Sequence, residues 1–203
     1  MEAVATLSRK EQIEQLATGL FQQKGYSATS MRDLAKALEI EAASIYSHIK
    51  SKEEILQKIC FRMADEFFTG LATVNTTSPA SSKLRAAIAA HVKVLTQNPA
   101  ASAVFQHEWK HLSEPFLTDF LKMREKYENT FRSIIQQGIS KGEFREIDAK
   151  FATLTLLSSL NWLHTWYKPN GKMSPEEIAE NLAEFQLKGL LNSEQEAGNS
   201  FSN

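Results

Sequence analysis

The chain has 203 residues, enough for one long domain or for a small domain joined to a larger one, and enough to bury a full hydrophobic core. Charged residues make up 23% of it and the formal net charge is −1, so the composition is ordinary for a globular protein and gives no electrostatic sign of a nucleic-acid partner. The single cysteine, Cys60, excludes an internal disulfide framework and fits a reducing compartment, which we expect to be the cytoplasm.

Glycine and proline are scarce, at eight and five residues, and no segment alternates with period two for long, so we predict an all-α fold. A cap at Ser8 or Thr6 starts the first helix, and the sequence Ser-Lys-Glu-Glu from Ser51 has the form of a capping box. The first four helices are expected at about 9–24, 30–38, 42–49 and from 51 onward.

The rest of the chain predicts longer helices after a linker-like stretch at residues 75–82. We expect helices at 83–97, 99–112, 114–141, 148–167 and 174–191, and a disordered tail at 193–203. The apolar run at 151–167 is interrupted by polar residues and predicts a buried helix rather than a membrane span. Residues 1–10 lack the apolar core of a signal peptide, so we expect no membrane association.

Two short helices with a tight turn between them, flanked by longer amphipathic helices, make up a helix-turn-helix arrangement. Within residues 30–49, one set of side chains is apolar and forms a small core, and the other set is short or flat and faces outward, which suits a helix in a DNA major groove. The core set is Leu34, Ala35, Leu38, Ile40, Ile45 and Ile49, and the outward set is Ala42, Ala43, Ser44, Tyr46, Ser47 and His48.

The stretch from Phe21 to Leu56 resembles the DNA-binding domain of TetR-family transcriptional regulators. The resemblance is carried by Gly25-Tyr26, by the sequence TSMRDLA from Thr29 and by IYSHIKSKEEIL from Ile45. It implies an N-terminal three-helix helix-turn-helix DNA-binding domain at residues 1–56, followed by a larger helical ligand-binding and dimerisation domain at residues 57–192.

The resemblance also implies roles for single residues. Tyr46, His48 and Lys52 match the family's phosphate-contacting positions, Thr29 and Ser30 lie at a helix N-terminus whose N–H groups can bind phosphate, and Arg32, Ala43 and Ser44 match positions that read or approach base edges. Residues 1–56 nevertheless hold seven Lys and Arg against eight Asp and Glu. The DNA-binding prediction therefore depends on the pattern and on where the positive charges lie.

Two features depart from the family pattern. Glu39 stands where the family usually has glycine, so the turn is strained if this residue needs a positive φ. Ala42 and Ala43 are small and limit direct hydrogen bonding to bases. We therefore expect base specificity to depend on Arg32, Ser44, methyl contacts and DNA shape.

The segment from Asn161 to Ala179 resembles a signature of a TetR-family branch that responds to acyl-CoA thioesters in fatty-acid, sterol or aromatic-acid catabolism, and residues 141–148 are similar to that branch. The resemblance implies a repressor released from DNA by such a thioester. The branch usually has a basic residue in the helix before its second tryptophan, where this chain has only His164.

An acyl-CoA needs an apolar channel for its acyl chain and cations for its phosphates. The candidate ligand-binding residues are Phe105, Trp109, Phe120, Met123, Arg124, Tyr127, Trp162 and Trp166, each of which could equally be ordinary core or solvated surface. The helix around residues 151–163 is apolar on most sides and predicts, together with the last helix, a four-helix interface in a homodimer. Such a dimer suits a near-palindromic operator in double-stranded DNA.

The sequence leaves two other classes of function open. One is a DNA-binding regulator controlled by a protein partner or an unrelated small molecule. The other is an enzyme built from His107, Glu108 and Asp119, for which no glycine-rich phosphate loop or nucleophile motif supports a case. His107 and His111 have metal-ligand spacing but lack a third ligand, so we expect no metal, no cofactor and no enzymatic activity.

Overall fold

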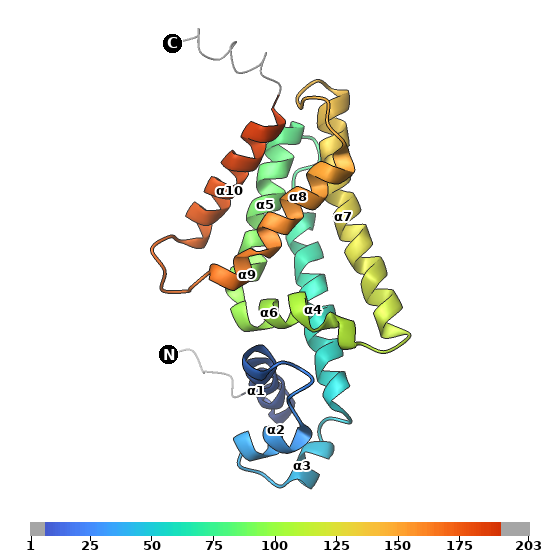
Figure 1. Ribbon diagram of the computed structural model, residues 1–203, viewed down its shortest axis with the longest axis vertical. Coiled ribbons are helices and arrows are strands. Elements are labelled where there is room, and N and C mark those ends of the chain that lie inside the picture. The colour runs from blue at the N-terminus through green and yellow to red at the C-terminus, as the bar shows by residue number, and fades with distance from the viewer. Residues whose placement is uncertain (1–6, 192–203) are drawn as a thin grey trace. The chain divides into compact units, whose positions relative to one another are not determined.

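The computed structural model describes residues 7–191, apart from the side chain of Ala42 (Figure 1). Thr6 and the expected tail at 193–203 lie outside the described residues. The helices are α1 (Arg9–Lys24), α2 (Met31–Ala37), α3 (Ala42–Tyr46), α4 (Lys52–Ala72), α5 (Ala80–Gln97), α6 (Pro99–His107), the short 3₁₀ helix η1 (Trp109–His111), α7 (Phe116–Ser140), α8 (Ala149–Asn161), α9 (Leu163–Trp166) and α10 (Pro175–Leu190). In the described part of the chain no strand forms, which confirms the all-α prediction.

Side-chain caps start several helices where the sequence predicts them. Ser8 forms a reciprocal capping box with Glu11, and Ser174 forms one with Glu177. At α4 the box is only half formed, because Ser51 accepts the Glu54 N–H while the Glu54 carboxylate accepts the N–H of Lys50 instead. Local sequence thus fixes where these helices begin.

Some helix bounds differ from the prediction. Helix α3 ends at Tyr46 because the N–H of His48 bonds the Ile45 carbonyl, which tightens the last turn. Helix α5 begins three residues early, at Ala80, because the Glu143 carboxylate accepts the Ser81 N–H at its first turn. The helices expected at 99–112 and 148–167 are each divided in two.

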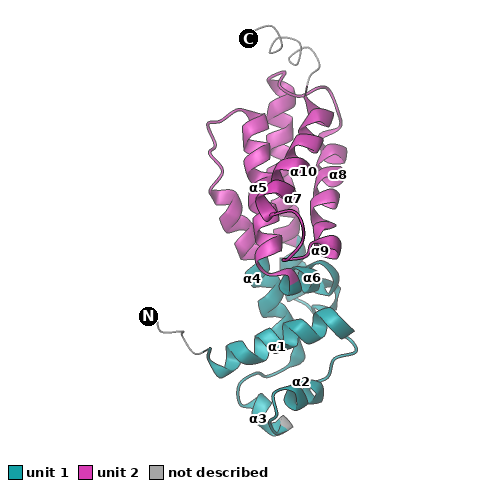
Figure 2. Ribbon diagram, turned by 90° about the vertical axis from the view of Figure 1, so that its left-hand side faces the viewer, with its two compact units in different colours: residues 1–63, 100–121 teal, residues 64–99, 122–203 magenta. Residues whose placement is uncertain are grey.

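The chain forms two compact units, which Figure 2 colours separately. The head unit comprises residues 1–63 and 100–121, and the bundle unit comprises residues 64–99 and 122–203. Residues 100–121 fall within the range assigned from sequence to the larger domain, yet they pack with the head. Helices α4 and α7 each run from one unit into the other.

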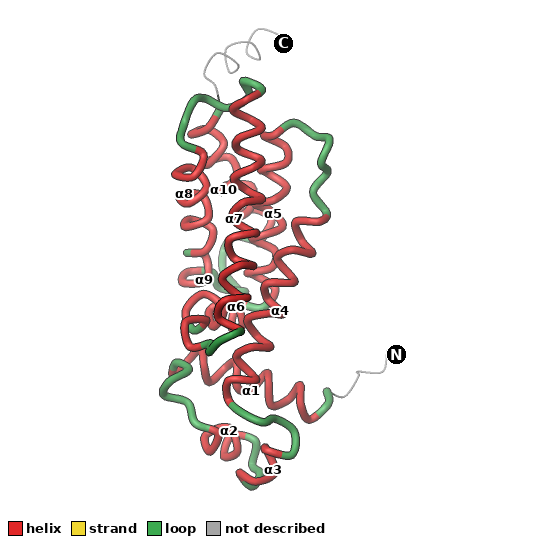
Figure 3. The backbone as a smooth tube through the Cα atoms, turned by 90° about the vertical axis from the view of Figure 1, so that its right-hand side faces the viewer, coloured by secondary structure: helices red, strands yellow, loops and turns green. Residues whose placement is uncertain are grey.

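Each unit has its own core. In the head, α1 to α4 bury Ile13, Phe21, Leu34, Ala35, Ile45, Ile49, Leu56 and Cys60. In the bundle, α5 packs against α8, α9 and α10, and the core includes Leu84, Ile88, Val92, Leu95, Phe131, Leu156, Leu160, Ala183 and Leu187. Figure 3 shows the described chain as helices joined by loops. None of the helices within residues 7–191 is long and apolar enough to cross a membrane.

Candidate functional site

Helix α3 presents the outward face that the helix-turn-helix pattern predicts. Ile45 and Ile49 are buried, at 0% and 1% exposed, and anchor the helix and the turn after it on the head core. The side chains of Ala43, Ser44, Tyr46 and His48 are all exposed, Tyr46 by 55%. These short and flat side chains allow the α3 backbone to approach a groove closely.

The turn between α2 and α3 holds Glu39 in a left-handed conformation, with φ of 55°. The N–H of Ile40 bonds the Ala35 carbonyl and the N–H of Glu39 bonds that of Lys36, which is the Schellman ending of a helix. Glu39 occupies the position that usually requires glycine, so the strain expected from its sequence position is present. The strain of a left-handed residue with a side chain is about 1–2 kcal/mol.

The N-terminus of α2 is closed by its own side chains. Asp33 accepts hydrogen bonds from the N–H and the hydroxyl of Ser30, and these bonds lower the pKa of the Asp33 carboxyl group. Thr29 is only 1% exposed and its hydroxyl donates to the Gly25 carbonyl at 2.9 Å. The N–H groups left at the first turn are those of Met31 and Arg32, and the Arg32 side chain is exposed.

Lys52 is tied to the backbone of the head. Its Nζ donates to the carbonyls of Tyr26 and Thr29 at 2.7 and 2.8 Å and lies 4.1 Å from the centre of the Tyr26 ring. Partial burial lowers the pKa of Lys52, and the negative charge of Glu108 opposes that shift. This lysine holds the start of α4 against the loop before α2.

The segment that follows α6 is also part of this assembly. The His111 ring stacks on Tyr26 with 5.2 Å between ring centres, and its Nε2 lies 3.4 Å from both the Ser27 hydroxyl and the Glu108 carboxylate. Glu53 on α4 accepts the N–H of Ser113 at 2.8 Å. Residues 108–113 are therefore fixed to the surface that orients α2 and α4.

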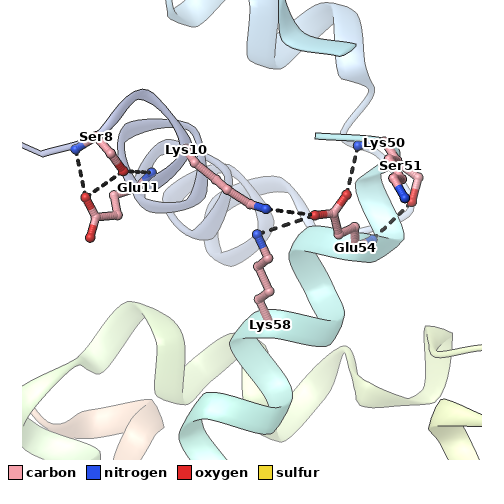
Figure 4. A network of polar contacts seen from close by, with 7 residues as sticks. All are labelled: Ser8, Lys10, Glu11, Lys50, Ser51, Glu54 and Lys58. Atoms are coloured by element: carbon pink, nitrogen blue, oxygen red, sulfur yellow. Dashed lines mark hydrogen bonds and ion pairs between the residues drawn. The ribbon is translucent and has the colours of Figure 1, made fainter. Parts of the chain in front are cut away.

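Several acidic side chains of the head are engaged in internal contacts. Glu54 accepts the N–H of Lys50 and lies 3.3 and 3.4 Å from the ammonium groups of Lys10 and Lys58, as Figure 4 shows. Glu14 pairs with Arg62 in the same way. Meanwhile Arg32, Lys36 and Lys50 are exposed in the region of α2 and α3, but Glu39 and Glu41 are exposed there too. The positive charge therefore lies at single positions and not across the whole region.

The eight candidate ligand-binding residues fall in both units. Phe105, Trp109 and Phe120 cluster in the head, where the Phe120 ring centre is 5.4 Å from Phe105 and 6.1 Å from Trp109. In the bundle, Met123 is half-buried and Arg124 is exposed, and Tyr127 packs in an aromatic core. Trp162 and Trp166 lie on the bundle surface, 63% and 42% exposed.

Sequence reasoning missed His91 on α5, which is the polar centre of that aromatic core. Its Nδ1 lies 3.0 Å from the Tyr127 hydroxyl, and its ring centre is 4.7 Å from that of Phe67. Burial lowers the pKa of His91 to about 3, against an opposing effect of Asn161, so the ring is neutral. The only sequence signal is that His91 falls on the apolar stripe of Ile88, Val92 and Leu95.

The bundle exposes apolar side chains on α8 and α10. Phe151 and Leu154 on α8 are 64% and 44% exposed and fall on one helix face with Trp162, while Phe185 on α10 is 76% exposed. Gln186 on α10 donates to the Ser159 hydroxyl on α8, so the two helices lie side by side. A face of this kind is typical of a protein–protein interface.

Two of the candidate catalytic and metal-ligating residues, Glu108 and His111, make a contact internal to the head. His107 is exposed. Among the described residues, no group of three His, Cys, Asp or Glu side chains is placed to hold a metal ion. Burial, with the charge of Glu108, raises the pKa of the Cys60 thiol to about 12, so this cysteine is a poor nucleophile.

Two family models match the chain. Residues 14–59 match the model for bacterial regulatory proteins of the tetR family, and residues 77–190 match the tetracyclin repressor-like C-terminal domain. The HTH-type transcriptional repressor KstR2 of Mycolicibacterium smegmatis is 29% identical over 192 residues, which cover 92% of this chain and 93% of that protein.

Solved structures agree with these matches. The TetR family transcriptional regulator PfmR from Thermus thermophilus has a TM-score of 0.79 and 32% identity, covering 91% of this chain and 100% of that one. AibR in complex with isovaleryl coenzyme A and operator DNA has a TM-score of 0.77 and 25% identity, covering 88% and 97%. The matched families and relatives are DNA-binding regulators, not enzymes.

Proposed function

This chain belongs to the TetR family of transcriptional regulators, and on that premise we propose that it is a homodimeric repressor of genes for lipid or organic-acid catabolism, released from a near-palindromic operator by an acyl-CoA. The observation that carries the DNA-binding role is the exposed face of α3 above the buried Ile45 and Ile49. We assign DNA binding to residues 1–56 and effector binding and dimerisation to residues 57–192. Because a regulator of this kind must reach the DNA of the cell, we also propose a cytoplasmic location.

The proposed DNA contacts divide into two kinds. Tyr46 and His48 bind phosphate, and Arg32, Ala43 and Ser44 approach base edges, since all five side chains are exposed. Thr29, Ser30 and Lys52 contribute to DNA binding indirectly. Their side chains already form hydrogen bonds within the head, and these bonds hold α2 and α4 in place.

Selection from a random duplex library with the purified dimer tests this assignment. Tyr46→Phe and His48→Ala should weaken binding to every selected sequence by a similar factor, because contacts to phosphate carry no sequence information. Arg32→Ala and Ser44→Ala should change which bases are selected. Gln136→Ala, at an exposed position on α7, is the control. The proposal would be contradicted if neither Arg32→Ala nor Ser44→Ala changed the selected sequence.

The proposed dimer interface is the exposed apolar face of α8 and α10. In a two-fold dimer, Phe151, Leu154, Trp162 and Phe185 would bury apolar area that the single chain leaves in water. Ala179, Ala183 and Leu187 instead pack within the bundle, so α10 contributes its opposite face. Phe185→Glu should shift the protein to monomers in sedimentation experiments, and Gln136→Glu, which adds the same charge on α7, should not.

The acyl-CoA effector is supported by the signature at residues 161–179 and by AibR, whose solved complex contains isovaleryl coenzyme A and operator DNA. A thermal-shift series of CoA thioesters tests it, because a ligand that binds only the folded state raises the melting temperature. A shift by one thioester class that neither its free acid nor coenzyme A produces is the expected result. No shift across the series, with folded protein that binds DNA, would favour control by a protein partner or an unrelated small molecule.

We propose that residues 108–113, which belong to the head, take part in the coupling of effector binding to DNA binding. The His111 ring stacks on Tyr26 and the Ser113 N–H bonds Glu53, so an effector that displaced this segment would also strain Tyr26 and Glu53. A conformer with displaced DNA-binding surfaces is then favoured by the ligand. A hundredfold loss of operator affinity needs a coupling free energy of only about 2.7 kcal/mol.

A further inference from the structure

The aromatic core of the bundle contains a hydrogen-bonding atom that the fold does not use. His91 is 2% exposed, and its ring is surrounded by Phe67 from α4 and by Tyr127 and Phe131 from α7. Nδ1 has the Tyr127 hydroxyl as its partner, 3.0 Å away. Nε2 is buried and makes no hydrogen bond of ordinary geometry among the described residues, and the one other polar side chain that acts on the ring is that of Asn161, which opposes the effect of burial on the pKa of His91. Buried polar atoms without a partner are uncommon in folded proteins and indicate an absent water or ligand.

Counting protons shows which hydrogen-bonding character this atom has. The imidazole is neutral, and burial raises the pKa of the Tyr127 phenol, so the pair holds one N–H and one O–H. If the phenol donates to Nδ1, only the Nε2–H group lacks a partner. If Nδ1–H donates to the phenol, both the phenol proton and the Nε2 lone pair lack one. The first arrangement leaves fewer buried groups unpaired, so Nε2 carries the proton.

We propose that the Nε2–H group of His91 binds a carbonyl oxygen of the effector, with Tyr127 fixing the tautomer. A carbonyl is a compact acceptor with apolar atoms on both sides, which suits a donor surrounded by Phe67 and Phe131. The thioester carbonyl of an acyl-CoA meets this description, and a thioether analogue, which has a methylene group in place of the carbonyl, does not. The inference rests on the proposed function, since it requires an effector that enters the bundle.

Pairs of ligands that differ only at the carbonyl test the assignment. The probes are isovaleryl-, octanoyl- and benzoyl-coenzyme A and their thioether analogues S-isopentyl-, S-octyl- and S-benzyl-coenzyme A, titrated calorimetrically into the full-length dimer. We expect the wild-type protein to bind at least one thioester about tenfold more tightly than its thioether. In His91→Phe the two affinities should become equal, while in His91→Gln, whose amide can replace the Nε2–H donor, part of the preference should return.

Two controls separate a ligand contact from a structural role. Thr96→Val removes a buried hydroxyl from the same helix, where it donates to the Val92 carbonyl, and should leave the thioester preference unchanged. The double variant His91→Phe, Tyr127→Phe should melt at the same temperature as Tyr127→Phe or higher, because His91→Phe then removes the unpaired buried donor without leaving the Tyr127 hydroxyl unpaired. Operator affinity without ligand should not change in any of these variants.

The possible failures are distinguishable. If wild-type protein binds none of the six compounds, the acyl-CoA effector and the role of His91 are both overturned. If wild-type protein prefers a thioester and His91→Phe keeps that preference, the effector class stands and His91 has no part in it. If the double variant His91→Phe, Tyr127→Phe melts below Tyr127→Phe and the thioester preference is unchanged in His91→Gln, Nε2 instead bonds a group of the fold, either the Asn161 side chain or an ordered water.

Discussion

Lys52 in the head and His91 in the bundle are both partly or fully buried polar groups, but the fold treats them differently. Lys52 has two carbonyl acceptors and an aromatic ring for its ammonium group, whereas one nitrogen of His91 has no partner in the described structure. A saturated group fixes the shape of its surroundings, as a surface that reads DNA requires. A buried group that lacks a partner lowers the stability of the fold but leaves one donor that a ligand can bind.

The largest loss of stability should come from removing the ammonium group of Lys52. Lys52→Met keeps the length of the side chain but leaves the carbonyls of Tyr26 and Thr29 without their charged donor, so we expect a loss of about 2–3 kcal/mol in the free energy of unfolding. Urea denaturation measures it. Lys58→Met, which removes a lysine from a more exposed ion pair with Glu54, should cost less than about 1 kcal/mol. Equal losses in the two variants would show that Lys52 is no more than a surface charge.

The pH dependence of stability should separate the two units. The pKa of His91 lies below its ordinary 6.5, so the unfolded state takes up the proton first and stability is lost as the pH falls from 6.5 towards 3. The slope should approach about 1.4 kcal/mol per pH unit. In His91→Phe, the free energy of unfolding should be flatter between pH 6.5 and 5. An unchanged slope in that variant would mean that His91 is protonated in the folded state.

Glu53 in the head gives a contribution at lower pH. Its bonds from the Ser113 hydroxyl and N–H lower its pKa below the ordinary 4.5, so the stabilisation is present above pH 4.5 and is lost as the pH falls through the folded-state value. Glu53→Gln should flatten the unfolding free energy below pH 4.5 and leave the slope above pH 5 as it was. The two variants together separate the contribution of His91 above pH 5 from that of Glu53 below pH 4.5.

The smallest effect concerns two left-handed helix ends. Two residues after the end of α2 in the head lies Glu39 with φ of 55°, and two residues after the end of α7 in the bundle lies Gly142 with φ of 71°, each with Schellman hydrogen bonds. Glu39→Gly should stabilise the protein by about 0.5–1 kcal/mol, and Gly142→Ala should destabilise it by about 1 kcal/mol, both measured by thermal unfolding. A loss of stability in Glu39→Gly would mean that contacts of the glutamate outweigh its backbone strain.

The sequence was most informative where neighbouring residues decide the structure. The capping box at Ser174, the outward face of α3 and the strained position of Glu39 each depend on residues within a few positions of one another. The helix-turn-helix could therefore be predicted almost completely. The division of residues 148–167 at Trp162 was missed, because an apolar run gives no sign of where a helix breaks.

Contacts between distant residues could not be predicted in this way. Lys52 has the same local pattern as a solvated lysine, and its role depends on carbonyls 26 and 23 residues away. His91 and Tyr127 are 36 residues apart and meet only because α5 packs near α7. Thr29 looked like a surface cap, and its burial reflects how the loop after Gly25 folds back on α1.

Cys60 is a natural probe for local opening of the head. The thiol is fully buried and its pKa is raised to about 12, so an alkylating reagent cannot reach it until the surrounding helices separate. The rate at which a maleimide modifies the wild-type chain therefore measures how often that region opens, as hydrogen exchange does for a buried amide. Because the chain has one cysteine, the label reports this single opening without any substitution. Comparing the rate with and without operator DNA would show by how much DNA binding stabilises the closed head.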